Sequence, residues 1–546
     1  MTRPFARVWT RIVAGIGVAA MAVGAAIPAY AATYEPISGT GSTWSQNAID
    51  QWRSNVSGNY GMTVNYSGVG STRGRTDFIL GTVDFAVSEI PFQRNPEDGV
   101  SAPEIPNRGY AYMPIVAGGT AFMYNLVIGG KRVTNLRLSG EVITKIFTGK
   151  ITKWNDPAIQ ADNPGLAMPD KNITPVIRSD GSGTTAQFTL WMSKQYSSIW
   201  SDFTASVGRG NGLTSQYPLF GNAKAQNGSN GVAGYVAQGY GEGAITYVEY
   251  SYALESGFPV AKVLNKSDYY VEPTSNSVAV ALLSAQINTD ANSPDYLTQI
   301  LDGVYNSGDP RAYPLSSYSY MIVPTEVKGV FTEKKGATLG AFASYFLCEG
   351  QQQASSLGYS PLPMNLVLAG FDQIKRIPGA GGANVDPNKC NNPTFKAGDS
   401  PSTNQLALTA AQPAACDKKG SDQCVTGTAG AKGETPVSGS GSGGSASGAV
   451  GASGTAGGGA GAADAATGAG VLYDEDGNVI SGTGTGGTVA GAAVASPFTV
   501  APDGWGWQQS VMLFAFVLLL AAVVAPPLLL KAIRSAGGPD GKGGRR

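Results

Sequence analysis

The chain has 546 residues, too many for one globular core, so several separate segments are expected. Its formal net charge of −1 excludes the basic surface that nucleic-acid binding needs, and any selectivity for anions must come from local groups. Histidine is absent, which excludes Ser-His-Asp triads, Cys-His dyads and the commonest zinc ligand sets.

The N-terminus has the three parts of a secretory signal peptide. Three arginines lie in the first eleven residues, an apolar run covers 12–27, and a small-x-small cleavage site ends at Ala31. We expect residues 1–31 to be removed and the mature chain to begin near Ala32. A transmembrane role fits this segment less well, because its apolar run is short.

Three glycine-rich runs with small hydroxyl residues each lead into a helical pattern. They are Ser38-Gly-Thr-Gly-Ser-Thr-Trp44, Ser67-Gly-Val-Gly-Ser-Thr72 and Arg178-Ser-Asp-Gly-Ser-Gly-Thr184. One such run is typical of an ordinary turn. Three of them leave backbone N–H groups at the positive ends of three helix dipoles. Arg178 adds a fork of donors, so together they predict an anion site.

From Ala32 to about residue 378 the composition is that of a globular α/β part. Extended apolar runs at 118–128, 244–250 and 318–323 alternate with helical patterns at 141–147 and 337–348. The length of this part favours two lobes over one.

The four cysteines, Cys348, Cys390, Cys416 and Cys424, fit no Cys-x-x-Cys metal spacing. In an exported chain an even number indicates disulfides. Four cysteines allow three pairings; one of them joins Cys416 to Cys424 in a short loop and leaves Cys348 for Cys390.

The part after the globular segment changes character. Residues 379–504 are predicted to be a low-complexity linker rich in Gly, Ala and Ser, interrupted by a hairpin pattern at 471–480. An apolar run within 505–533 is long enough to cross a bilayer as one helix, and two tryptophans precede it. Residues 534–546 would then be a short basic cytoplasmic tail, and the linker would tether the globular part to the cell membrane.

Several motifs, in order and at near-constant offsets, resemble the extracytoplasmic phosphate-binding protein of the high-affinity phosphate ABC transporter. The similarity covers about Ser38 to Pro363. The matching segments are Gly39-Thr-Gly-Ser-Thr-Trp44, Val64-Asn-Tyr-Ser-Gly-Val-Gly-Ser71, Thr82-Val-Asp-Phe-Ala-Val-Ser-Glu-Ile-Pro91, Ile146-Phe-Thr-Gly-Lys-Ile-Thr-Lys-Trp154, the Arg178 run and Gly243-Ala-Ile-Thr-Tyr-Val-Glu-Tyr250.

The resemblance implies a two-lobed, hinge-closing type II periplasmic-binding-protein fold, with lobe I at about 32–116 and 315–378 and lobe II at about 117–314. It also implies an inorganic phosphate ion, bound without water in the cleft. Its ligands would be Thr43, Trp44, Ser71, Glu89, Arg178, Ser182, Gly183 and Thr184. Asp180 would orient Arg178 from behind, and no catalytic residue, metal or cofactor is implied.

Two positions depart from the family pattern. Glu89 stands where the family has aspartate, whose carboxylate accepts a hydrogen bond from a protonated phosphate oxygen and so rejects sulfate. The alternative is that Glu89 points to solvent and another group accepts the hydrogen bond from the protonated phosphate oxygen. Arg73 stands where the family has glycine; it would contact the anion, neutralise Glu89, or lie on the surface as a solvated arginine.

The function implied is a membrane-tethered solute-binding protein that captures phosphate outside the cytoplasmic membrane and delivers it to the permease subunits of an ABC importer. No enzymatic activity and no nucleic-acid partner are expected. The alternatives are a phosphate sensor or surface scaffold with the same fold, and a phosphate-ester hydrolase, for which Ser71 and Ser182 have no evident base.

Overall fold

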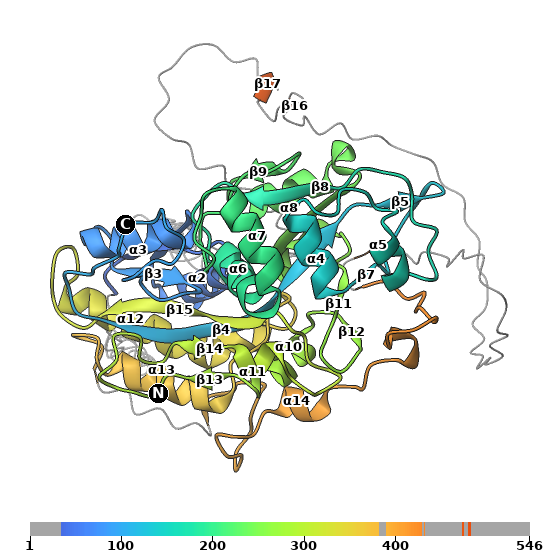
Figure 1. Cartoon of the computed structure of the whole chain (residues 1–546). Helices are drawn as coiled ribbons and strands as arrows, with labels where there is room; N and C mark the ends of the chain where they lie inside the picture. The colour runs from blue at the N-terminus through green and yellow to red at the C-terminus, as the bar shows by residue number, and fades with distance from the viewer. Residues whose placement is uncertain (1–33, 382–388, 429–430, 432–471, 474–478, 482–546) are drawn as a thin grey trace, which may run out of the picture. The chain divides into compact units, whose positions relative to one another are not determined.

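The computed structural model of the chain describes residues 34–381, 389–428, 431, 472–473 and 479–481 (Figure 1). The chain divides into two compact units, residues 1–446 and 447–546. In the second unit, strands β16 (Leu472–Tyr473) and β17 (Val479–Ser481) pair antiparallel, within the segment for which the sequence indicated a hairpin. The first unit contains the predicted α/β part.

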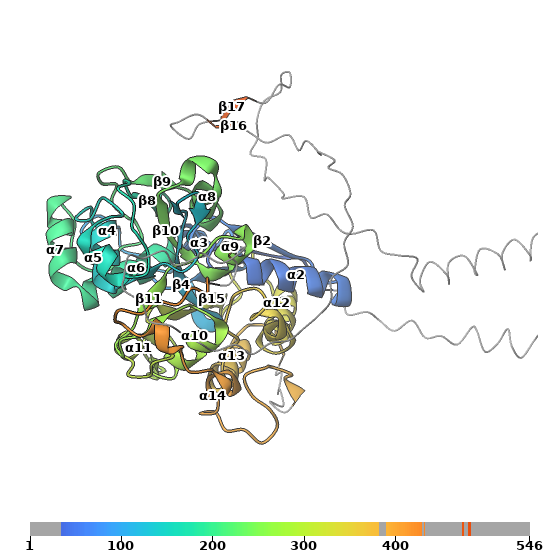
Figure 2. The same ribbon diagram turned by 90° about the vertical axis from the view of Figure 1, so that its right-hand side faces the viewer.

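An eight-stranded sheet runs through the α/β part in the order β2-β1-β3-β15-β4-β10-β8-β9. Its strands are β1 (Ile37–Gly41), β2 (Val64–Gly68), β3 (Phe85–Ser88), β4 (Tyr110–Tyr124), β8 (Thr174–Arg178), β9 (Lys224–Gln226), β10 (Ala244–Glu249) and β15 (Ser316–Pro324). β1 pairs parallel with β2 and β3, and β8 pairs parallel with β9 and β10. The central pair β4 and β15 is antiparallel and joins the two halves, and these strands run side by side in both views (Figures 1 and 2).

The hydrophobic residues form separate cores at the two ends of this central pair. The first core, which defines lobe I, includes β4 as far as Ala117 and β15 from Tyr318 onward. The remaining cores, which define lobe II, begin at Ala121 in β4 and end at Leu315 before β15. The fold is therefore two-lobed, and the chain crosses between the lobes along β4 and at the start of β15. The residue limits proposed for the lobes from the sequence stay predictions.

Helices pack around each core. Lobe I has α2 (Gln46–Tyr60), α3 (Ser71–Leu80), α12 (Glu333–Leu347) and α13 (Met364–Ile374). Lobe II has α4 (Gly140–Phe147), α5 (Pro157–Asp162), α6 (Gly183–Gln195), α7 (Ser197–Ser206), α8 (Gly228–Ala237), α9 (Tyr250–Ser256), α10 (Ser275–Leu282) and α11 (Asp302–Tyr305).

Shorter elements complete the α/β part. They are the strand pair β5 (Val127–Ile128) and β6 (Lys131–Arg132), the sheet of β7 (Arg137–Leu138), β11 (Lys262–Leu264) and β12 (Tyr270–Val271), the pair β13 (Gln286–Ile287) and β14 (Gln299–Ile300), and the 3₁₀ turns η1 (Gly239–Gly241) and η2 (Glu349–Gln353). The elements expected at 141–147, 244–250, 318–323 and 337–348 are present within four residues of their limits. The strand expected at 118–128 begins eight residues earlier, because β4 covers Tyr110–Tyr124.

Residues 389–428 correct the predicted linker, which was placed at 379–504. This segment folds against lobe II through an ion pair between Lys262 and Asp417, with Nζ 2.8 Å from both carboxylate oxygens. Phe395 lies in the lobe I core and Ala407 in the lobe II core. The prediction failed because the average composition of 379–504 is rich in Gly, Ala and Ser, although its first part contains buried apolar residues and three of the four cysteines.

Along its length, this segment contacts first lobe I and then lobe II. Cys390 is bonded to Cys348 of lobe I, and the Thr394 hydroxyl donates to the Leu362 carbonyl at 2.8 Å. Helix α14 (Gln405–Thr409) then packs on α10, and the turn η4 (Ala415–Asp417) leads into the loop closed by Cys416 and Cys424. Both disulfides follow the pairing that the sequence left as one of three alternatives.

Replacing both Cys348 and Cys390 by serine is expected to lower the free energy of unfolding by about 4 kcal/mol, because the bridge spans 42 residues and loop-closure entropy grows with loop length. The matched change at Cys416 and Cys424, 8 residues apart, should lower it by about 2.5 kcal/mol. Urea unfolding of the two double variants checks this order. A larger loss at the short loop would contradict it.

The remaining predicted segments lie outside the described residues. They are the signal peptide at 1–31, most of the linker beyond 431, the apolar span at 505–533 and the tail at 534–546. Among the residues that the structure describes, no helix has both the length and the apolar character needed to cross a membrane.

Candidate anion-binding site

The loop between β8 and α6 forms one wall of the site. The Ser182 hydroxyl caps α6 by accepting a hydrogen bond from the Thr185 N–H at 3.2 Å. In the described part of the chain, no backbone carbonyl accepts from the N–H groups of Gly183 or Thr184, which belong to the first turn. The Thr184 hydroxyl oxygen is buried and also lacks a hydrogen-bond partner in this part of the chain. This helix end therefore presents two N–H donors and one hydroxyl to an anion.

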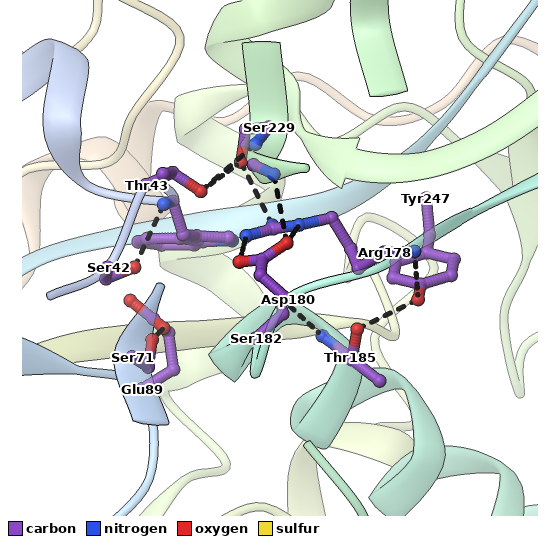
Figure 3. Close-up of polar contacts among 12 residues, drawn as sticks. Ser42, Thr43, Ser71, Glu89, Arg178, Asp180, Ser182, Thr185, Ser229 and Tyr247 are labelled. Carbon is purple, nitrogen blue, oxygen red and sulfur yellow. Dashed lines mark hydrogen bonds and ion pairs between the residues drawn. The ribbon is translucent and has the colours of Figure 1, made fainter. Parts of the chain in front are cut away.

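Arg178, the last residue of β8, is held in a fixed orientation by Asp180. Its Nε donates to Asp180 Oδ1 at 2.7 Å, and its Nη2 donates to Oδ2 (Figure 3). The Gly228 N–H also donates to Oδ1, at 2.9 Å. Burial raises the pKa of the Asp180 carboxyl, but the hydrogen bonds and charge of Arg178 outweigh burial and hold that pKa below its usual value. Asp180 is thus an anion that keeps the guanidinium in place, as the sequence analysis expected.

A serine outside the three predicted runs completes this wall. Ser229, at the start of α8, accepts from Arg178 Nη1 at 3.3 Å, and its hydroxyl lies 2.9 Å from the Thr43 hydroxyl (Figure 3). The Ser229 N–H donates to the same Thr43 oxygen at 3.1 Å. With Asp180 and Ser229 using three of the five guanidinium N–H groups, two remain for an anion.

Lobe I supplies the opposite wall. Thr43 and Trp44 lie between β1 and α2, both almost fully buried, and the Trp44 N–H already donates to the Ser42 hydroxyl at 2.9 Å. The expected role of the Trp44 N–H as an anion ligand would require it to exchange this partner. Ser71 is the first residue of α3, and no hydrogen-bond acceptor for its N–H is found in the described residues.

Glu89 follows β3 directly and is completely buried, which excludes the alternative that it points to solvent. Its carboxylate accepts hydrogen bonds from the Ser71 hydroxyl at 2.8 Å and from the Ser319 hydroxyl at 2.5 Å. A Cβ atom added at Gly183 would lie 1.9 Å from Glu89 Oε2, so the carboxylate reaches across the cleft to the first residue of α6. The extra methylene of glutamate, compared with the family's aspartate, is accommodated opposite a glycine.

Arg73 does not join the site. Two thirds of its side chain is exposed, 67 %, and its Nε pairs with Asp77 Oδ1 at 2.7 Å. The reason is helical geometry: Arg73 is two residues after Ser71 in α3, and two residues correspond to about 200° of rotation. Since Ser71 faces the cleft, Arg73 faces away from it, which agrees with the alternative of a surface arginine and corrects its proposed place beside Glu89.

Two residues of the site, Ser229 and Ser319, were not predicted from the sequence, for different reasons. Ser229 follows Gly228, which has φ of +69°, so a fourth glycine-hydroxyl pair leads into a helix and was a usable signal. Ser319 lies in the serine- and tyrosine-rich first half of β15, and nothing in its neighbourhood in the sequence distinguishes it from Ser316 or Ser317. Only the pairing of β15 with β3 brings it to Glu89.

The two walls are in contact. The Thr72 N–H of lobe I donates to the Gly181 carbonyl of lobe II at 3.0 Å, and the Gln187 amide of lobe II donates to the Glu89 carbonyl at 2.7 Å. With Thr43 bonded to Ser229, the lobes meet around the whole cluster. This is a closed arrangement in which the cluster is shielded from water.

The comparisons with known proteins agree with this architecture. A family model described as PBP superfamily domain matches residues 26–349. The phosphate-binding protein PstS of Xylella fastidiosa (strain Temecula1 / ATCC 700964) is 34% identical over 333 residues, which cover 61% of this chain and 82% of that protein. The chain belongs to the PstS family of the PBP superfamily.

A second curated protein and one solved structure are also similar to this chain. The phosphate-binding protein PstS of Haemophilus influenzae is 32% identical over 336 residues, 61% of this chain and 90% of that protein. A solved high-affinity periplasmic phosphate-binding protein bound with phosphate is 20% identical, covers 66% of this chain and 99% of that chain, and has a TM-score of 0.48. The matched family model ends before the segment 389–428 that packs on both lobes.

Replacing Gly183 by alanine is expected to weaken anion binding by about ten- to a hundredfold. The added methyl group would overlap Glu89 Oε2 at 1.9 Å and Ser71 Oγ at 2.6 Å, and overpacking costs about 1–3 kcal/mol. Calorimetric titration with phosphate measures the loss. Gly234 in α8 is the matched control, since a Cβ there meets nothing within 4 Å; equal behaviour of the two variants would contradict the closed cleft.

Proposed function

We propose that this PstS family chain captures inorganic phosphate in the cleft between its lobes. The observation that carries the proposal is a buried carboxylate, Glu89, within a cluster that otherwise offers donors. Arg178, the N–H groups of Ser71, Gly183 and Thr184, and the Thr43 hydroxyl donate to a tetrahedral oxyanion. The Ser71 hydroxyl would join them only by releasing the Glu89 carboxylate, to which it now donates. Glu89 accepts a hydrogen bond from the protonated oxygen that phosphate has near neutral pH and that sulfate lacks, so sulfate would meet repulsion and an unmade hydrogen bond.

Closure of the lobes is the event that would trap the ion. In the closed arrangement every proposed ligand is less than one tenth exposed, so a bound phosphate would exchange its water for fixed protein donors. A closed lobe pair then differs from an open one in the surface that it presents, and a partner that recognises the closed form responds only to loaded protein.

The cellular role follows the same proposal. The chain delivers phosphate to the permease subunits of an ABC importer and works outside the cytoplasmic membrane, to which the apolar run at 505–533 tethers it. Two observations support an exported location: the signal-peptide pattern at the N-terminus and the two disulfides. Membrane fractionation of the full chain and of a chain ending at residue 504 tests the tether; recovery of both in the soluble fraction would sink it.

Calorimetry on residues 32–431, stripped of bound anion, tests phosphate capture. This segment keeps the folded extension that a boundary at 379 would remove. Tight binding of phosphate with no heat from sulfate supports the proposal. Silence with both anions would favour a sensor or scaffold without a working site, and release of a chromogenic alcohol from its phosphate ester would favour a hydrolase.

A further inference from the structure

A small cavity lies beside Gln187, where the chain crosses between the lobes. Its volume is about 10 Å³, the size needed by one water molecule. It is bordered by Thr120 of β4, Ser317 of β15, Gln187 of α6 and Tyr305 of α11. These residues come from four different elements, of which only α11 and β15 are consecutive in the sequence.

Each of these four side chains has a buried polar atom that lacks a hydrogen-bond partner among the described residues. In the described part of the chain, no hydrogen bond is made by Thr120 Oγ1, Gln187 Oε1, Ser317 Oγ or the Tyr305 hydroxyl. The residues are 1%, 7%, 2% and 6% exposed. A buried polar group with no partner is costly, and four around one cavity are unusual in a folded protein.

We propose that one ordered water occupies this cavity and hydrogen-bonds all four side chains. Gln187 Oε1 accepts only, so the water donates one hydrogen to it. Each of the three hydroxyls both donates and accepts, so one takes the second water hydrogen and the other two donate to the water lone pairs. Four bonds saturate the water, and they leave none of the four protein atoms without a partner.

This water would position a residue of the anion site. Gln187 Nε2 donates to the Glu89 carbonyl at 2.7 Å, across the closed lobes. The opposite orientation of the amide would place two oxygens against each other at Glu89, and a water donor at Oε1 disfavours it. The water therefore keeps Gln187 as the donor that joins lobe II to the backbone of Glu89.

A crystal structure of the full chain at a resolution that orders internal waters tests occupancy. We expect a single density peak about 2.7–3.2 Å from Gln187 Oε1 and from the hydroxyl oxygens. An empty cavity, or hydroxyls turned to protein acceptors, would overturn the proposal. This measurement does not depend on phosphate binding.

The positioning role rests on the proposed phosphate binding and is tested by Thr120→Val in the full chain, with inorganic phosphate as the probe. Valine keeps the shape but removes one bond to the water, so phosphate should bind about two- to tenfold more weakly, mainly through faster release. The control is Thr338→Val in α12, equally buried and remote from the site. Equal affinity of the two variants would overturn the role, whereas no binding by the unchanged protein would instead reject the proposed function.

Discussion

Replacement of Arg178 by methionine is expected to weaken phosphate binding by about 10²- to 10⁴-fold. The guanidinium has two N–H groups free for the anion, and a hydrogen bond to a charged group is worth about 1.5–3 kcal/mol. The substitution also leaves the buried Asp180 carboxylate without its cation, close to where the anion would lie. Calorimetric titration with phosphate measures the loss.

Two further variants separate charge from geometry at this position. Arg178→Lys keeps a positive charge but loses the fork that holds Asp180 and the anion together, so we expect a loss between that of methionine and the unchanged protein. Arg73→Met removes an exposed arginine whose partner among the described residues is Asp77, and this variant should bind phosphate normally. A strong loss at Arg73, or none at Arg178, would contradict the site.

Replacement of Glu89 by glutamine is expected to reduce the preference for phosphate over sulfate by about 10²- to 10⁴-fold. Glutamine has nearly the same shape, yet its neutral amide neither repels a fully ionised oxyanion nor requires a proton on it. Sites that demand one hydrogen-bond partner discriminate by about 10⁴- to 10⁵-fold, and a glutamine that still forms hydrogen bonds would keep part of that discrimination. Competition calorimetry, in which sulfate displaces phosphate, gives the ratio for each variant.

The matched control is Glu249→Gln. Glu249 is also completely buried, lies at the end of β10, and accepts from the Ser251 N–H at 2.7 Å, outside the proposed ligand set. Burial raises the pKa of Glu249 well above its usual value and so disfavours its charged form, which makes the change to glutamine electrostatically milder than at a carboxylate held ionised. If both variants changed selectivity equally, buried carboxyls in general, and not Glu89, would be responsible.

The extension at 389–428, which lies beyond the matched family model, adds contacts that link the two lobes. It is bonded to lobe I through Cys390 and lies against lobe II through Asp417 and the loop of Cys416 and Cys424. The Gln405 N–H donates to the Thr394 carbonyl at 2.7 Å. This hydrogen bond joins the part of the segment that contacts lobe I to helix α14, which packs on lobe II. Removal of this segment in solution studies would therefore change the stability of both lobes.

The local part of the site could be predicted from the sequence because its chemistry is local. A glycine-rich run that enters a helix exposes N–H groups whatever surrounds it, so the runs ending at Trp44, Thr72 and Thr184 all lie at a cleft wall. Arg178 and Asp180 are two residues apart, close enough for their pair to form within one loop. The composition likewise indicated alternating helices and strands.

The tertiary structure decided what depends on distant segments. Ser319 reaches Glu89 only because β15 pairs with β3, and Ser229 reaches Thr43 only because the lobes close. Arg73 turned away because one helix cannot present Ser71 and Arg73 to the same cleft. The sequence by itself determined which groups bind anions, since donor chemistry belongs to the residue. Which of them meet was left to the fold, since contacts between residues more than a hundred positions apart depend on packing that no local pattern records.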